Sequence, residues 1–209
     1  MIRRWDIITI GNLSRNRYWG EGDEKRLRDA WCTCTLITGR DFRLMVDPSL
    51  RNPAAMAAEL DRRTGLKPEA IDAVFITHHH GDHHWGVEAF PSAKWLAAPP
   101  VAELVNRETQ YSKPVEPVAH RLFEGVEMIA TPGHTKEHHS LVFRCDGQAV
   151  VIAGDAVMTR DFFAHRQGYL NSVDFERATR TIEEIARIAD IVVPGHDNYF
   201  AVSLTPFAE

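Results

Sequence analysis

Residues 78–83 read His-His-His-Gly-Asp-His, so five side chains that can bind a metal ion stand within six positions, and four of them have the spacing His-x-His-x-Asp-His. A short apolar run comes directly before them. In extended backbone alternate residues point to the same side, so we expect His78 and His80 to project together, with Asp82 and His83 turning in from the next loop. One ion cannot comfortably use all four donors. The segment therefore predicts the anchor of a metal site rather than a solvated histidine-rich loop.

Three further candidate ligands follow strand-like apolar runs later in the chain. They are His134, Asp155 and His196, and the runs before them are residues 126–130, 149–153 and 191–193. Because the same arrangement of strand and ligand occurs four times, we expect seven donors to meet at one edge of a sheet.

This ordered set resembles the signature of the metallo-β-lactamase-fold superfamily, which is His-x-His-x-Asp-His followed by a histidine, a bridging aspartate and a final histidine. The resemblance covers nearly the whole chain. It implies one metal ion held by His78, His80 and His134, a second held by Asp82, His83 and His196, and Asp155 bridging the two. The true β-lactamases of the superfamily usually carry cysteine or serine in place of this aspartate. The chain is therefore more similar to the glyoxalase II-like and lactonase-like hydrolases, as a small single-domain member.

The same resemblance implies a hydrolase with two divalent metal ions as cofactors, zinc being favoured and iron or manganese being alternatives because the ligands include no thiolate. Metal binding lowers the pKa of water from about 15.7 to about 7, so a metal-bridging hydroxide replaces a serine or cysteine nucleophile. Asp82 is the expected catalytic residue, because a coordinating carboxylate can also relay a proton to the leaving group.

An ester, lactone or thioester is the preferred substrate, since several apolar residues near the ligands suit an acyl group. Four aromatic residues are candidates for substrate binding, although each is equally compatible with core packing: Trp85, Phe162, Phe163 and Tyr169. Tyr18 and Trp19 are candidates for the rim of the pocket. Met158 weakens the likeness to homoserine-lactone hydrolases, which often have tyrosine at that position. A full glyoxalase II would carry a helical carboxy-terminal domain, whereas residues 197–209 alone follow the last ligand.

Three alternative functions remain open. A phosphodiesterase or nuclease of the same fold has a similar compact layout. A persulfide dioxygenase would use a single iron ion held by two histidines and an aspartate, so metal stoichiometry separates it from a dinuclear hydrolase. A non-enzymatic metal-binding module is less favoured, because structural zinc sites are closed and commonly rich in cysteine.

Composition is typical of a soluble enzyme with one domain over residues 1–209, of which 44% are hydrophobic. A net charge of −5 gives no general basic footprint for nucleic acid, which is therefore a disfavoured partner. No signal-peptide core or membrane-spanning run is visible, so we expect a cytoplasmic protein that acts on a small molecule. The sequence does not indicate an oligomeric state. An odd number of cysteines in strand-like surroundings, at positions 32, 34 and 145, favours reduced core thiols.

Ligand histidines nearly always have a partner that orients the ring, and Asp47, Thr77 and Asp197 are candidates for this role, with Asp47 the strongest. We expect His79 and His84 to face solvent or to support the ligands from behind. The histidines that are not predicted to bind metal at all are His120, His138, His139 and His165.

The ligands need a scaffold of alternating strands and helices. The patterns predict strands over residues 5–10, 33–38, 42–46, 73–76, 94–97, 126–130, 141–145, 149–153 and 191–193, with Asp146-Gly147 as a hairpin turn. They predict helices over residues 54–63, begun by Asn52-Pro53 and ended by Gly65, over 100–107, and over 174–188, capped by Ser172. We therefore expect an α/β (α+β) fold with two mixed β-sheets covered by helices. The arrangement as a four-layer αββα sandwich is implied by the resemblance.

Overall fold

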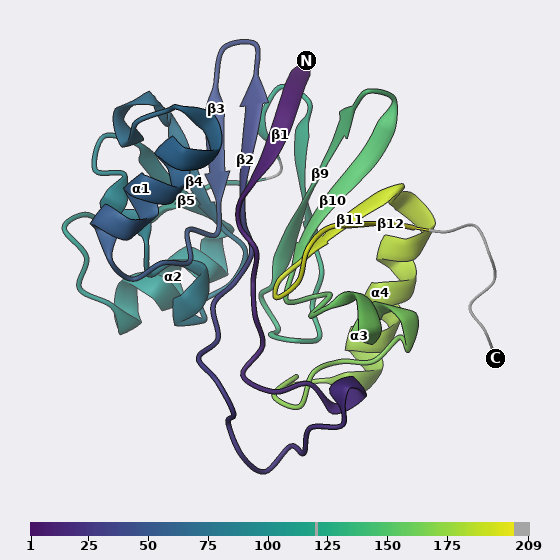
Figure 1. Ribbon diagram of the computed structural model, residues 1–209. Coiled ribbons are helices and arrows are strands. Elements are labelled where there is room, and N and C mark those ends of the chain that lie inside the picture. The colour runs from purple at the N-terminus through teal and green to yellow at the C-terminus, as the bar shows by residue number, and fades with distance from the viewer. Residues whose placement is uncertain (120, 203–209) are drawn as a thin grey trace.

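The computed structural model describes residues 1–119 and 121–202, and its strands form two mixed sheets that lie side by side (Figure 1). Sheet 1 has the order β1 (Ile2–Thr9), β2 (Cys34–Gly39), β3 (Arg43–Val46), β4 (Ala73–Ile76), β5 (Lys94–Ala97) and β6 (Glu116–Pro117). Sheet 2 has the order β12 (Phe200–Ala201), β11 (Ile191–Pro194), β10 (Gln148–Gly154), β9 (His139–Cys145), β8 (Val126–Ala130) and β7 (Arg121–Phe123). Each sheet contains parallel and antiparallel pairs.

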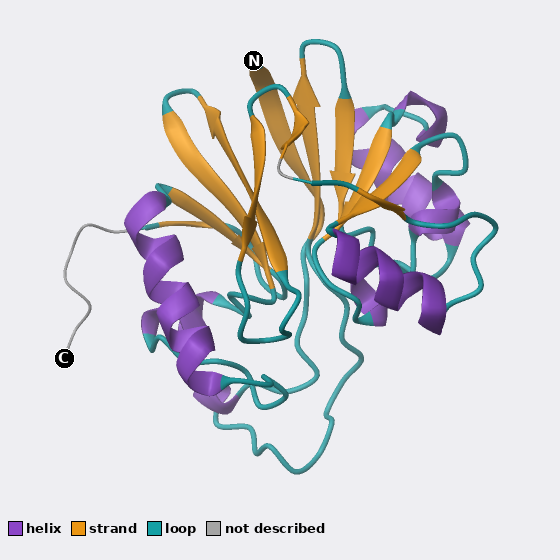
Figure 2. Cartoon of the chain, turned by 180° about the vertical axis from the view of Figure 1, so that it is seen from behind, coloured by secondary structure: helices purple, strands orange, loops and turns teal. Residues whose placement is uncertain are grey.

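Helices cover the outer side of each sheet (Figure 2). Helices α1 (Pro53–Thr64) and α2 (Pro99–Glu108) pack on sheet 1, while α3 (Arg160–Ala164) and α4 (Phe175–Ile188) lie on the side of sheet 2. The predicted α/β fold of two mixed sheets between helices is confirmed.

Sheet 1 is apolar on both faces because it is buried between two layers. Along β3 and β4, Met45 and Val74 belong to the core beneath α1 and α2, whereas Leu44 and Phe75 belong to the core between the two sheets. Successive side chains of a strand point to opposite faces, so a strand covered on both sides reads as a continuous apolar run. This explains why the short runs before the ligands could be recognised as strands.

Most predicted elements agree with the structure to within three residues at each end. Helix α1 begins after Asn52, whose side chain accepts hydrogen bonds from the backbone N–H groups of residues 54 and 55, and ends at Gly65 with a positive φ. The predicted cap of α4 at Ser172 is wrong, because the Asp174 carboxylate accepts the hydrogen bond from Arg177 N. Sequence patterns did not indicate α3 or the short strands β6, β7 and β12, which have two to five residues each.

A long segment, residues 10–33, joins β1 to β2 and runs below the lower edge of both sheets (Figure 1). We call it the β1–β2 segment. Its short 3₁₀ turn η1 (Arg17–Trp19) lies beside α3, in the half of the molecule that contains sheet 2. Among the described residues, no helix is long and apolar enough to cross a membrane.

Candidate metal centre

The seven predicted ligands come from both sheets and meet where the strands end. His78, His80, Asp82 and His83 occupy the loop after β4 of sheet 1, where a 3₁₀ turn over Gly81–His83 brings the last two inward. His134, Asp155 and His196 follow β8, β10 and β11 of sheet 2. A metal centre built from these residues therefore requires the two sheets to be packed together.

The first group of donors contains three imidazoles and one carboxylate. Nδ1 of His80 lies 3.0 Å from Nε2 of His78 and 2.9 Å from Nε2 of His134. One oxygen of Asp155, Oδ2, lies 3.2 Å from His134 Nε2 and 3.7 Å from His78 Nε2. Tetrahedral coordination at Zn–N distances of about 2.0–2.1 Å would separate neighbouring nitrogens by about 3.3 Å, so the spacing fits a shared cation.

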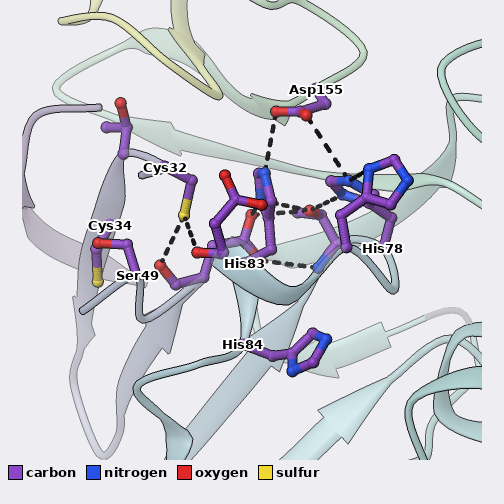
Figure 3. Close-up of polar contacts among 12 residues, drawn as sticks. Cys32, Cys34, Ser49, His78, His83, His84 and Asp155 are labelled. Atoms are coloured by element: carbon purple, nitrogen blue, oxygen red, sulfur yellow. Dashed lines mark hydrogen bonds and ion pairs between the residues drawn. The ribbon is translucent and has the colours of Figure 1, made fainter. Parts of the chain in front are cut away.

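The second group contains Asp82, His83 and His196, whose ligating atoms lie within 4.8 Å of one another. The other oxygen of Asp155, Oδ1, lies 3.0 Å from His83 Nε2 and 3.2 Å from His196 Nε2. Figure 3 shows this carboxylate facing His83 and His78 together. Asp155 therefore stands between the two groups and offers one oxygen to each.

Room for the Asp155 carboxylate depends on a neighbouring glycine. A Cβ atom at Gly195 would lie 2.0 Å from Asp155 Oδ1, which is far inside van der Waals contact. The Pro-Gly-His sequence after β11 thus allows His196 and Asp155 to approach the same point.

Orphaned polar atoms at this point fit a bound cation. His83 Nε2 and Asp155 Oδ1 are buried, and within the described part of the chain neither has a partner in hydrogen-bonding geometry, although the two atoms are only 3.0 Å apart. Buried polar atoms are rarely left unsatisfied, because each costs free energy. Nitrogen and carboxylate donors that converge without hydrogen bonding are the donor set that zinc and similar ions prefer.

The pKa values of four ligand histidines are shifted in two opposite directions. Burial and neighbouring histidines lower the pKa of His78 well below its usual value and lower the pKa of His80 to about 4. Burial also works against a charge on His83, but the nearby carboxylates of Asp155 and Asp47 outweigh it and raise the pKa of His83. The pKa of His196 is likewise raised, since Asp155 and Asp82 outweigh the effect of burial.

Asp47 is placed to orient His83, as expected from the sequence. Its Oδ2 accepts hydrogen bonds from His83 Nδ1 at 2.8 Å and from the Thr77 hydroxyl at 2.7 Å, while Oδ1 accepts from Thr77 N at 2.9 Å. The backbone of Asp47 is left-handed, with φ of 50°, which aspartate tolerates better than most residues. The prediction that Asp197 orients a ligand histidine is wrong, because its side chain accepts a hydrogen bond from Arg160 N. The Nδ1 atom of His196 instead contacts the backbone carbonyl oxygens of Asn12 and Trp31.

The histidines next to the ligands have other partners. His79 pairs with the half-buried carboxylate of Glu137, on the loop after His134. His84 is buried and turned away from the donors (Figure 3), where Nδ1 contacts the Tyr111 hydroxyl at 2.7 Å and Nε2 donates to the His79 carbonyl. These contacts place His79 and His84 behind the ligands. His138 packs against the His78 ring, and His120 lies outside the described residues.

The three cysteines are free and buried, as predicted. The sulfur of Cys32 lies near Asp47 and His83. Burial raises the pKa of this thiol to about 12, and its Sγ lies 3.3 Å from the backbone carbonyl oxygen of Asp47 and 3.0 Å from that of Asp82, so that its single S–H has an acceptor. It is therefore a protonated thiol that supports the backbone of the site.

A cavity of about 200 Å³ opens onto the donors. The ligands at its base are His80, Asp82, Asp155 and His196, and the surrounding residues are Leu13, Ser14, Ala30, Met158, Tyr169 and Asn171. Among the predicted substrate-binding residues, Tyr169 lines this cavity. Phe162 is fully buried behind Tyr169, with the ring centroids 5.4 Å apart.

The other two substrate-binding predictions do not agree with this cavity. Phe163 packs against Phe200 in the core between sheet 2 and α4. Trp85 lies over Gly81 beneath the Arg51 guanidinium. The sequence did not indicate Leu13, Ser14 and Ala30 as cavity residues. They lie in the β1–β2 segment, where no periodic pattern of apolar residues shows which side chains turn inward.

Comparison with known proteins gives a family match. The model of the family described as the metallo-beta-lactamase superfamily matches residues 31–196. A hydroxyacylglutathione hydrolase of Rhodobacter capsulatus is 34% identical over 88 residues, covering 41% of this chain and 34% of the relative. An N-acyl homoserine lactonase of a Bacillus species is 26% identical over 149 residues, covering 65% of this chain and 60% of the relative.

The matched parts thus span between about a third and three fifths of these relatives. A solved structure from Thermotoga maritima, described provisionally as a metallo-beta-lactamase, superposes with a TM-score of 0.71 at 20% identity. The match covers 96% of this chain and 99% of that one, so the likeness extends over the whole fold.

Proposed function

The chain belongs to the metallo-beta-lactamase superfamily, and we propose that it is a hydrolase with two divalent metal ions, zinc being favoured, that cleaves an ester, lactone or thioester. Iron and manganese are the alternative metals, since the donors are nitrogen and oxygen atoms.

The position of Asp155 carries this proposal. Its two oxygens lie 3.0–3.2 Å from nitrogens of both donor groups, and a carboxylate in that position suits two ions better than one. His78, His80 and His134 would hold one ion, Asp82, His83 and His196 the other, and Asp155 both. Bound in this way, the ions would supply an activated water and polarise the carbonyl of the substrate.

Asp82 is the proposed proton carrier. Its carboxylate lies 3.5 Å from His196 Nε2, lines the cavity, and keeps 18% of its side chain exposed. It can therefore touch both a ligand position and a substrate in the cavity. We expect it to accept the proton of the attacking water and pass it to the leaving group.

The names of the relatives support a carbonyl substrate, since one is a hydroxyacylglutathione hydrolase and another an acyl homoserine lactonase. The lining of the cavity supports the same choice. Leu13, Met158 and Tyr169 give it an apolar side that suits an acyl group, and among its lining residues there is no lysine or arginine to bind a phosphate.

The decisive experiment compares metal-free protein with protein reloaded with zinc, iron or manganese, on a panel of an ester, a lactone, a thioester and a phosphodiester. We expect about two equivalents of metal at saturation, with hydrolysis of a carbonyl substrate that disappears in a chelator and returns with metal. One equivalent of iron and oxygen consumption with a persulfide would replace this proposal with a dioxygenase. Hydrolysis of the phosphodiester alone would replace it with a nuclease-like activity.

A further inference from the structure

His84 is a buried histidine that follows the ligand His83 directly and belongs to neither donor group. Its side chain is 2% exposed and points away from the donors (Figure 3). Both ring nitrogens have a partner, because Nε2 lies 2.9 Å from the His79 carbonyl oxygen and Nδ1 lies 2.7 Å from the Tyr111 hydroxyl. A buried ring with a partner at each nitrogen is held in one orientation.

The two partners also determine where the ring carries its proton. A carbonyl oxygen only accepts hydrogen bonds, so Nε2 of His84 is the protonated nitrogen that donates to His79. Burial lowers the pKa of His84, which leaves the ring neutral and Nδ1 without a proton. Nδ1 then accepts from the Tyr111 hydroxyl, and burial raises the pKa of that hydroxyl to about 12. The Tyr111 hydroxyl thus selects the tautomer of His84 that can donate to His79.

A second acceptor lies within reach of the Tyr111 hydroxyl, which has a single proton. This acceptor is the His84 carbonyl oxygen at 3.1 Å, and it already accepts a hydrogen bond from Val87 N. Within residues 1–119 and 121–202, Nδ1 of His84 has no donor other than Tyr111. The shorter bond to Nδ1 therefore leaves fewer buried groups unsatisfied.

Tyr111 lies between α2 and β6 and is held in place by residues that do not belong to the metal loop. Its ring packs against the core of sheet 1 and meets Trp95 edge-on, with the ring centroids 5.9 Å apart. The next residue, Ser112, donates from its backbone N and its hydroxyl to the Glu88 carboxylate at 2.7 and 2.8 Å. The hydroxyl of Tyr111 is therefore a fixed point against which the metal loop can be set.

The His79 carbonyl, which His84 holds, controls the direction of the ligand His80. This oxygen and the backbone nitrogen of His80 belong to one planar peptide unit, so fixing the oxygen fixes the plane from which His80 projects. Nδ1 of His80 lies between Nε2 of His78 and Nε2 of His134, at 3.0 and 2.9 Å. Rotation of the peptide would move this nitrogen away from both.

Resting on the proposed dinuclear hydrolase, we infer that Tyr111 and His84 are positioning residues for the metal ion of the first donor group. The Tyr111 hydroxyl fixes the tautomer of His84. In turn, His84 fixes the peptide before His80 through the His79 carbonyl. Neither positioning residue touches the ion or the substrate.

Tyr111→Phe tests this inference, because it keeps the ring on Trp95 and removes the hydroxyl. Nitrogen NMR of the metal-free, full-length protein reports the tautomer of His84, and competition with a chromophoric chelator reports zinc affinity. We expect the Nε2–H tautomer in the wild-type protein and a mixture of tautomers in the variant. One of the two zinc affinities should fall about tenfold, as is typical for loss of a supporting hydrogen bond. Tyr18→Phe is the matched control, since it removes a hydroxyl that donates to Gln167 in a segment without ligands, and it should change neither quantity.

A double-mutant cycle separates positioning from a general structural role. His84→Gln supplies an amide that can donate to the His79 carbonyl without any tautomer to select. In that background, adding Tyr111→Phe should lower zinc affinity less than about twofold, the range expected for residues that no longer interact. Saturating zinc should also restore kcat in Tyr111→Phe. An equal loss of affinity in both backgrounds would mean that the hydroxyl acts on the fold alone.

The outcomes also distinguish this inference from the function on which it rests. An Nδ1–H tautomer in the wild-type protein, or unchanged zinc affinity in Tyr111→Phe, would overturn the inference and leave the hydrolase intact. The expected tautomer and loss of affinity in a protein that hydrolyses no substrate of the panel would support the inference and contradict hydrolysis. A wild-type protein that binds no zinc would contradict both.

Discussion

Among single residues, Asp155 has a position that no other proposed ligand shares, because its two oxygens face different donor groups. Asp155→Ala should therefore loosen both ions and reduce bound metal from about two equivalents to less than one. Hydrolysis should fall with it. The measurement is metal content after dialysis, together with initial rates.

His79→Ala serves as the comparison, because His79 sits between two proposed ligands but its Nδ1 pairs with Glu137, while its ring only packs against the ring of His80. It should retain both ions, with a modest loss of activity from the disturbed loop. Equal metal loss from the two variants would mean that His79 belongs to the coordination sphere and that the register of the triple histidine is different.

A second prediction concerns the carboxylate behind His83. Asp47→Asn keeps a residue that tolerates φ of 50° but replaces an accepting oxygen with a donating amide. Loss of such a supporting partner typically weakens metal affinity about 10–100-fold. Competition with a chromophoric chelator would measure this. Asp146→Asn is the matched control, because Asp146 has φ of 51° in the turn between β9 and β10 and should leave affinity unchanged.

Metal binding should also depend on pH in two different ways. The lowered pKa values of His78 and His80 mean that both rings are neutral at pH 7 and ready to bind. The raised pKa values of His83 and His196 mean that both rings hold protons to higher pH before a cation arrives. Since ligands must be deprotonated, affinity for the second ion should rise with pH through these raised values, and its binding should release protons.

Calorimetry in two buffers of different ionisation enthalpy would count the released protons. We expect more protons from the second equivalent of metal than from the first. The same release from both equivalents would contradict the division of the donors into two classes.

Among the helices and strands, the sequence predicted those elements whose apolar residues form a clear pattern. The four apolar residues of β4 predicted a buried strand, and the donors after it followed directly. The apolar face of α4 predicted its length, but the cap was predicted at Ser172 and the helix uses Asp174, because the backbone conformation decides which polar side chain reaches the first free N–H groups. Prediction of one domain over residues 1–209 stays a prediction.

The candidate site likewise has one part that the sequence predicted and one part that it did not. All seven proposed ligands could be found from spacing, because each follows a strand end. The cavity wall could not, since Leu13 and Ala30 come from a segment with little regular structure whose position depends on contacts with α3, more than one hundred residues away. Long-range docking leaves no local pattern to read.

This docking gives a prediction for the β1–β2 segment. Asp161→Ala removes the acceptor for both Asn16 and Trp19, so the segment should detach more often from α3. We expect faster hydrogen exchange over residues 12–31 and a KM about tenfold higher, consistent with the loss of two hydrogen bonds to a charged group. Asp29→Ala, which removes an exposed ion pair within the segment, should change neither quantity. Unchanged exchange in Asp161→Ala would contradict the role of this contact.

For the whole molecule, ligands from both sheets link metal binding to folding. Free metal at one hundred times the dissociation constant should stabilise the folded protein by about 2.7 kcal/mol if the unfolded chain does not bind it. A chelator should therefore lower the melting temperature of the loaded protein measurably. Asp155→Ala should respond much less to the chelator, because it should already have lost most of its metal.

The β1–β2 segment has a consequence for how this molecule could change over evolution. The donors are dispersed over four strand ends and are tied to the packing of both sheets, so none can move alone. Three of the six non-ligand residues of the cavity lie within one continuous stretch outside the sheets. Exchange of that single stretch can therefore alter which molecules enter while the chemistry is inherited unchanged, and transplanting it between homologues is a direct route to new specificities.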